Sequence, residues 1–200
     1  MTTQASSTGG WPATIELAGG PVTLRPLTAD DKTALLEFFR RVPAPERLYL
    51  KEDVTSTQVI DRWVRELDYT RVLPLLAWDG DRIIGDGTLH RSRAEARRHI
   101  GELRIVIDPD HRNRGVGRTL LHALVDVACA GDSQLEKLVF EVVADTERAA
   151  THTAEAIGFV KVATFSAHIR YFEGEPHDLH VYELQVGEPI VLDDPAAHMY

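Results

Sequence analysis

The chain has 200 residues, of which 44% are hydrophobic and 26% charged, a composition typical of one globular domain with short extensions. Its 31 acidic and 22 basic residues give a net charge of -9, the opposite sign to that of a protein that coats nucleic acid. The single cysteine, Cys129, excludes an intrachain disulfide, and no apolar run approaches the roughly 20 residues of a transmembrane helix.

The two ends of the chain differ in composition from its centre. Residues 1–20 are rich in Ser, Thr and Gly and lack the basic and apolar regions of a signal peptide. We therefore expect a cytoplasmic protein with a mobile leader over 1–20, in which Ile15 and Leu17 could fold back onto the body. Prolines and acidic residues indicate a tail over 187–200, which leaves one domain over 21–186.

The first half of the body alternates between strand and helix patterns. Val22–Leu27 has an apolar residue at every second position, as in a half-buried strand. Thr28 is a typical N-cap for the helix that follows, and Pro43 ends that helix. The other elements expected here are a helix at about 57–67 and a hairpin with strands at 75–78 and 83–90.

The second half contains the strongest helix pattern. Over 115–130, apolar residues recur at helical spacing along one face. The expected elements are a strand at 103–107, a helix at 115–130, a strand at 138–143, a helix at 147–157, and strands at 160–165 and 180–186. The order β-α-α-β-β-β-α-β-α-β-β predicts an α/β (α+β) domain with a mixed sheet flanked by helices.

A loop rich in arginine and glycine joins the strand at 103–107 to the long helix. Arg112, Arg114 and Arg118 surround Gly115 and Gly117 at the point where the helix begins. The first N–H groups of a helix have no partner within the helix, and the helix dipole adds positive charge there. Glycines allow an anion to approach the main chain. The loop therefore predicts a phosphate or pyrophosphate site.

Two common phosphate-binding motifs do not fit this loop. The P-loop signature Gly-x-x-x-x-Gly-Lys-Ser/Thr is missing. The dinucleotide fingerprint needs three glycines after the first strand of a βαβ unit, whereas this loop has two and follows a hairpin.

The pattern Arg-x-x-Gly-x-Gly at 112–117 resembles the acyl-CoA-binding motif of the GNAT N-acetyltransferase superfamily. The element order over about 22–186 is also similar to that of the family. Ile157-Gly158-Phe159 looks like the Leu/Ile-Gly-Phe corner that closes a later helix in GNAT enzymes. The stretch around Glu102 is similar to bacterial protein lysine acetyltransferases.

The resemblance implies a GNAT-like sheet that splays open between the strands at 103–107 and 138–143, with acetyl-CoA in the opening as co-substrate. Its pantetheine arm would pair with the edge of 105–107, and its pyrophosphate would lie on the backbone of 112–119. The acyl-CoA residues implied in this way are Ile105, Val106, Ile107, Arg112, Asn113, Arg114, Gly115, Val116, Gly117, Arg118 and Thr119.

Glu102 is the candidate general base. An alkyl amine with a pKa near about 10.4 is protonated at neutral pH and must lose a proton before it attacks a thioester. The resemblance places a catalytic glutamate at the start of the strand that leads to the motif, and Glu102 occupies that place. A purely structural glutamate paired with Arg104 is the alternative.

The sequence departs from the family where a tyrosine commonly protonates the departing CoA thiolate. That position holds Ala154, and Glu147 replaces an asparagine common near the start of the same helix. Tyr171 or Tyr182 could substitute, and a thiolate could also leave without an acid.

Other reactive residue types have structural interpretations. His111 is expected on the surface of the loop, and Cys129 as a small packing residue in the long helix. Trp63 is expected in the core, or with Tyr49 in the wall of a substrate pocket. No spacing of His or Cys fits a zinc site, so no metal is predicted.

The leading hypothesis is an acyl-CoA-dependent N-acetyltransferase whose acceptor is a protein lysine or a small amine. A catalytically silent acyl-CoA sensor or partner module is the alternative. Nucleic acid and membrane partners are not expected, and a homodimer stays open, because an exposed sheet edge can pair with a second copy.

Overall fold

One mixed sheet of eight strands organises the protein, in the spatial order β1-β2-β3-β4-β5-β6-β8-β7. The computed structural model describes residues 10–47, 50, 52–130, 133–170 and 174–187. The strands are β1 Ala13–Leu17, β2 Gly20–Pro26, β3 Val72–Asp79, β4 Arg82–Arg91, β5 Ile100–Ile107, β6 Lys137–Val143, β7 Val160–Arg170 and β8 Pro176–Gln185. The helices are α1 Lys32–Arg41, α2 Ala44–Arg47, α3 Thr57–Arg65, α4 Val116–Cys129 and α5 Arg148–Ile157. Within the described residues, no helix is both long and apolar enough to cross a membrane.

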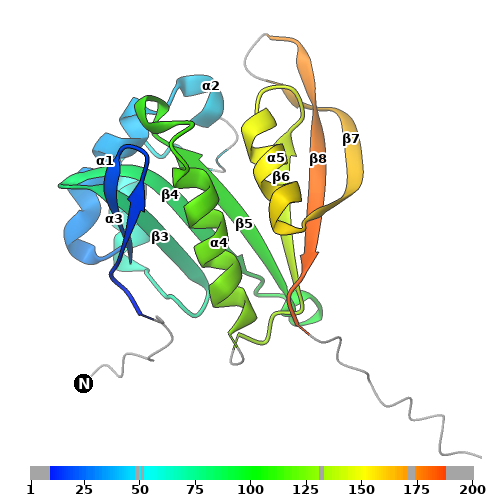
Figure 1. Ribbon diagram of the computed structural model, residues 1–200, viewed down its shortest axis with the longest axis horizontal. Helices are drawn as coiled ribbons and strands as arrows, with labels where there is room; N and C mark the ends of the chain where they lie inside the picture. The colour runs from blue at the N-terminus through cyan, green and yellow to red at the C-terminus, as the bar shows by residue number, and fades with distance from the viewer. Residues whose placement is uncertain (1–9, 48–49, 51, 131–132, 171–173, 188–200) are drawn as a thin grey trace, which may run out of the picture.

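The predicted mixed sheet and its flanking helices are confirmed. Every neighbouring pair of strands is antiparallel except β5 and β6, which are parallel. Helices α4 and α5 cover one face of the sheet, and α1 and α3 cover the other (Figure 1). The two faces contain separate hydrophobic clusters.

The structure adds two elements to the predicted order. Residues 13–17, expected within the mobile leader, form β1, which pairs with β2 in register Ile15 to Val22. Ile15 and Leu17 pack partly against the core, so the boundary expected at residue 20 falls inside a hairpin. The short helix α2 follows Pro43, which ends α1 as expected. Residues 1–9 and the predicted tail beyond Gly187 lie outside the described residues.

Close packing of α4 on β4 fixes which way the side chains of β4 face. A Cβ atom at Gly85 would lie 2.9 Å from Leu120 and 3.1 Å from Val116, both on α4. Only glycine fits this approach, because so short a distance is a steric clash. Side chains alternate along a strand, so Asp86 lies on the opposite face, beneath α1 and α3.

Candidate functional site

Strands β5 and β6 pair over only part of their length. The parallel ladder joins residues 100–103 of β5 to residues 137–140 of β6. Beyond these residues the strands diverge towards their carboxyl ends, as Figure 1 shows. The backbone of β5 from Arg104 to Ile107 therefore has no strand on this side in the described structure. Such an edge can hydrogen-bond an extended ligand.

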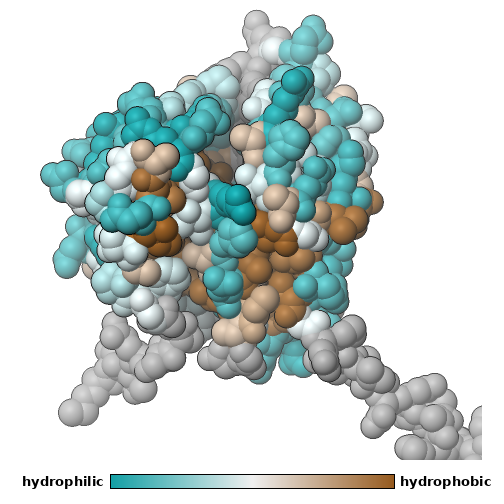
Figure 2. All heavy atoms as spheres, in the orientation of Figure 1, coloured by the Kyte–Doolittle hydropathy of each residue, from teal (hydrophilic) through white to brown (hydrophobic). Residues whose placement is uncertain are grey.

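The divergence opens a cavity of about 970 Å³, which we call the V-shaped cleft. It lies between β5, β6 and the first turns of α4 and α5, and Figure 2 shows the surface hollowed between the two halves of the molecule. Nine of the eleven predicted acyl-CoA residues line it, as does Glu102: Ile105, Val106, Ile107, Arg112, Asn113, Gly115, Val116, Gly117 and Arg118.

The other two predicted residues do not line the cleft. The side chain of Arg114 lies against Gly19 in the β1–β2 turn. Thr119 donates its hydroxyl to the Gly115 carbonyl at 3.0 Å and borders a different cavity. Both residues face the β1–β2 hairpin, Arg114 from the loop and Thr119 from α4.

The loop before α4 presents free backbone N–H groups to the cleft. The first bond of the helix runs from the Thr119 N–H to the Gly115 carbonyl at 3.0 Å, so the N–H groups of residues 116–118 precede it. Gly115 has φ +89°, which favours glycine, and forms the N-cap. With Arg112 and Arg118 beside these groups, the opening attracts an anion.

A glutamate from another element faces the same opening. Arg112 pairs with Glu46 of α2 at 2.5 Å, and both side chains are about two-fifths exposed. Glu46 and Arg112 both line the V-shaped cleft. An anion bound at the helix terminus would therefore compete with Glu46 for Arg112.

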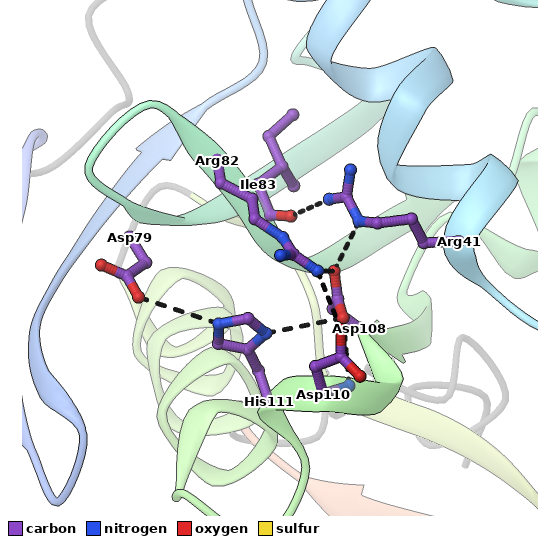
Figure 3. Close-up of polar contacts among 7 residues, drawn as sticks. All are labelled: Arg41, Asp79, Arg82, Ile83, Asp108, Asp110 and His111. Carbon is purple, nitrogen blue, oxygen red and sulfur yellow. Dashed lines mark hydrogen bonds and ion pairs between the residues drawn. The ribbon is translucent and has the colours of Figure 1, made fainter.

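Asp108 fixes the base of this loop. Its carboxylate is completely buried and accepts hydrogen bonds from Arg41 Nε at 2.7 Å and Arg82 Nη2 at 2.9 Å (Figure 3). It also accepts the Asp110 N–H at 3.1 Å, which caps the turn at 109–111. These donors outweigh burial and lower the pKa of Asp108 to about 2. The loop is thus tied to α1 and β4.

A second cavity, of about 700 Å³, lies between the sheet and helices α1 and α3, and we call it the side cavity. Its floor is a row of side chains from two paired strands, and its walls include apolar side chains of α1 and α3. The row pairs Asp86 with Val106, Thr88 with Arg104 and His90 with Glu102.

Glu102 belongs to both cavities. It lines the V-shaped cleft and the side cavity, as do Arg104 and Val106 of the same strand. A ligand held along the free edge of β5 would therefore meet a second ligand in the side cavity beside these residues. The site has the form required for transfer between two bound molecules, with Glu102 at the junction.

The residues considered for protonating a leaving group lie elsewhere. Ala154 is fully buried against the core. The Tyr182 hydroxyl donates to Glu155 at 3.2 Å, and Tyr182 is buried outside the cleft. Tyr171 and Tyr49 fall outside the described residues. The two described tyrosines, Tyr69 and Tyr182, line neither the cleft floor nor its walls.

Two of the expectations from the sequence, for His111 and for Cys129, are wrong. His111 is buried, with its ring between Asp79 and Asp108, because the turn at 109–111 folds it under the loop (Figure 3). Cys129 is exposed, because it lies in the last turn of α4, beyond the packed face. Trp63 is half-buried against Phe39 and also lines the side cavity.

The sequence analysis did not identify the roles of three residues in this region. These are Asp86 in the side cavity, Asp108 as the acceptor that fixes the loop, and Glu46 as the partner of Arg112. Asp86 had a readable signal, because it is an acidic residue between two glycines, in a segment that directly follows the apolar pair Ile83 and Ile84. Asp108 and Glu46 had none, since their partners come from distant segments. In the described residues, no group of three or more His, Cys, Asp or Glu is placed to hold a metal.

The family model for "Acetyltransferase (GNAT) family" matches residues 34–159. A GNAT-family acetyltransferase from Streptococcus pneumoniae superposes with TM-score 0.69 at 22% identity, covering 82% of this chain and 99% of that one. The structure of yncA from Salmonella typhimurium with its cofactor acetyl-CoA gives TM-score 0.71 at 19% identity, covering 86% and 98%. The GNAT domain of S. lividans PAT gives TM-score 0.69 at 20% identity, covering 88% and 98%. A search of curated proteins gave no match.

Proposed function

The chain belongs to the acetyltransferase (GNAT) family, and we propose that it transfers an acetyl group from acetyl-CoA to a primary amine by direct attack in a ternary complex. The single observation that carries this proposal is the junction of two cavities at Glu102, one of them bordered by a helix N-terminus and a free strand edge. Transfer without a covalent enzyme intermediate needs both substrates bound side by side.

The residues of the V-shaped cleft fit acetyl-CoA. The N–H groups of residues 116–118, with Arg112 and Arg118, would hold its phosphates. The backbone of Ile105–Ile107 would pair with its pantetheine arm. When bound, acetyl-CoA supplies the activated acyl group as a thioester.

The chain then supplies proton transfer and orientation. The Glu102 carboxylate would take the proton from the ammonium of the acceptor, directly or through water, and leave a nucleophilic amine. With Ala154 buried and Tyr182 held by Glu155, we propose that the CoA thiolate leaves without a proton from either position.

The size of the side cavity favours a small acceptor. At about 700 Å³ it falls within the range of small-molecule sites. We therefore place a small primary amine ahead of a protein lysine.

The experiment is thiol release from acetyl-CoA with a panel of amino acids, polyamines, aminoglycosides and lysine peptides. Release above hydrolysis with one class supports the proposed function and identifies the class. Acetyl-CoA binding by calorimetry with no release on any amine would support a silent acyl-CoA-binding module instead.

Gly117 gives a test of the acetyl-CoA site that is separate from turnover. A Cβ there would meet only Ile107, at 3.6 Å, so the protein itself tolerates alanine at this position. We expect Gly117→Ala to keep its melting temperature and to weaken acetyl-CoA binding by about 10- to 100-fold, since a methyl group would block phosphate contacts with the backbone. Isothermal calorimetry and thermal unfolding measure both quantities.

Gly115→Ala is the matched comparison. With φ +89° at this position, alanine is strained, and we expect this variant to lose about 1–2 kcal/mol of stability as well as affinity. Wild-type acetyl-CoA affinity in Gly117→Ala would remove the loop backbone from the phosphate site.

A further inference from the structure

Asp86 is a carboxylate for which the described residues provide no counter-ion. Its Oδ1 accepts a hydrogen bond from the Thr88 hydroxyl at 3.0 Å, which is its one hydrogen bond within the described part of the chain. Burial raises the pKa of Asp86 to about 7, and the Thr88 hydrogen bond offsets only part of that rise. A charge in such a place is stable only with a partner, and a ligand can be that partner.

The side cavity that Asp86 borders has apolar and acidic walls. It is lined by Leu27, Leu35 and Phe39, and also by Glu52, Glu66 and Asp68. The arginines Arg71, Arg91 and Arg93 border the same cavity from the end beside His90, the opposite end of the strand row. The remaining cation of the row, Arg104, lies across from Thr88. A ligand that reaches Asp86 therefore needs an apolar stem and a positive end.

Glu102 and Asp86 occupy opposite ends of this row. Glu102 faces His90, and Asp86 precedes His90 by four residues on β4, which separates the two backbones by about 13 Å at roughly 3.3 Å per residue. Glu102 borders both cavities, whereas Asp86 borders the side cavity alone. Because Glu102 is the proposed base, the amine that reacts lies beside Glu102. A cation on Asp86 is therefore a second group of the same acceptor.

We propose that Asp86 binds the non-reacting ammonium of a linear aliphatic diamine or polyamine, whose other amine is acetylated beside Glu102. This inference rests on the proposed acetyltransferase function and names the substrate class of its acceptor site. The methylene chain packs along the apolar walls, and the two carboxylates hold the two ends. Asp86 is in this role a binding residue that sets specificity, and Glu102 remains the base.

The test compares spermidine and 1,8-diaminooctane, which are long enough to reach both carboxylates, with n-octylamine, which lacks the second ammonium. We expect the wild-type protein to prefer the diamines by about 10- to 100-fold in kcat/KM, the range of one charge-assisted hydrogen bond. In Asp86→Asn we expect KM for the diamines to rise by this factor, while kinetics with the monoamine and acetyl-CoA affinity stay unchanged.

Two further readouts separate ligand binding from folding and from catalysis. Calorimetry of spermidine with the CoA-saturated protein reports binding without turnover, and Asp86→Asn should weaken it by the same factor. The variant should melt at the same or a higher temperature at pH 8, because it removes a poorly solvated charge. Glu37→Gln, exposed on α1 and outside both cavities, removes a charge as a control and should change none of these values.

Equal kcat/KM for diamines and monoamines in the wild type, or an unchanged diamine preference in Asp86→Asn, would overturn the role of Asp86 while leaving the acetyltransferase proposal intact. A loss of stability in Asp86→Asn that explains its lower activity would also overturn it. Failure of the wild type to acetylate any amine would instead overturn the proposed function, and this inference with it.

Discussion

Glu102→Gln is expected to lower turnover by about 10²–10⁴-fold while leaving the affinity for acetyl-CoA unchanged. Glutamine keeps the size and hydrogen-bonding capacity of the side chain but cannot accept a proton from the ammonium of the acceptor. Since Glu102 lies where the two cavities meet, its loss affects the reacting centre and not the loop that would hold the phosphates. Steady-state kinetics with a saturating amine and calorimetry with acetyl-CoA give the two values.

The step that is affected distinguishes a base from a merely structural carboxylate. Loss of a base lowers kcat and leaves the melting temperature unchanged, whereas loss of a structural ion pair lowers the melting temperature as well. Glu16→Gln, an exposed glutamate in β1 and outside both cavities, serves as the matched control. Full turnover in Glu102→Gln with a good amine would remove this residue from the mechanism.

Asp108→Asn is expected to lower the free energy of unfolding by about 2–4 kcal/mol at neutral pH. Asparagine can still accept the Asp110 N–H, but it cannot balance the charges of Arg41 and Arg82 around a fully buried position. Breaking a buried ion pair costs about 3–5 kcal/mol, and we place the effect lower because both guanidinium groups retain some contact with solvent. Chemical denaturation at several pH values measures the loss.

The contribution of Asp108 to the free energy of unfolding decreases as the pH falls. The pKa of Asp108 is lowered from 3.8 in the unfolded chain to about 2 in the folded protein, so its stabilisation is fully present above about pH 4. It disappears as the pH falls from about 4 to about 2, and amounts to about 2 kcal/mol at about 1.4 kcal/mol per pKa unit. Asp108→Asn should therefore show a flatter stability curve on the acid side.

Asp110→Asn is the control for this prediction. Asp110 is 76% exposed and pairs with the same Arg82 at 3.2 Å, so its removal should change stability by less than about 1 kcal/mol. An equal loss of unfolding free energy in Asp108→Asn and Asp110→Asn would contradict the conclusion that Asp108 fixes the loop.

The pKa shift of Asp86 affects stability in the opposite direction to that of Asp108. Its folded pKa of about 7 lies above the usual value of 3.8, so the folded protein holds a proton that the unfolded chain has released. Between about pH 4 and about pH 7 this carboxyl makes stability fall as the pH rises. Such a cost beside a cavity is typical of a functional site, which supports the role inferred for Asp86.

The sequence by itself determined the fold class, the order of most elements and the position of the loop rich in arginine and glycine before α4. These depend on local patterns: alternation in β2, helical periodicity in α4, and arginines and glycines where a helix begins. Such patterns determine local structure because neighbouring residues alone set backbone preference and periodic burial. The same locality places Glu102 and the backbone of residues 105–107 on one strand, so their relation to the loop was readable from the chain.

Only the tertiary structure decided which side chains share a cavity. Arg114 and Thr119 belong to the same loop and helix as Arg118, yet they face away from the cleft. His111 is buried because Asp79 and Asp108 surround it, and β1 forms because β2 offers a free edge. Asp86 shares the side cavity with Glu102 only because α4 packs against Gly85, which leaves the next residue on the other face of the sheet. Each of these facts depends on contacts between segments distant in sequence, which local preferences cannot specify.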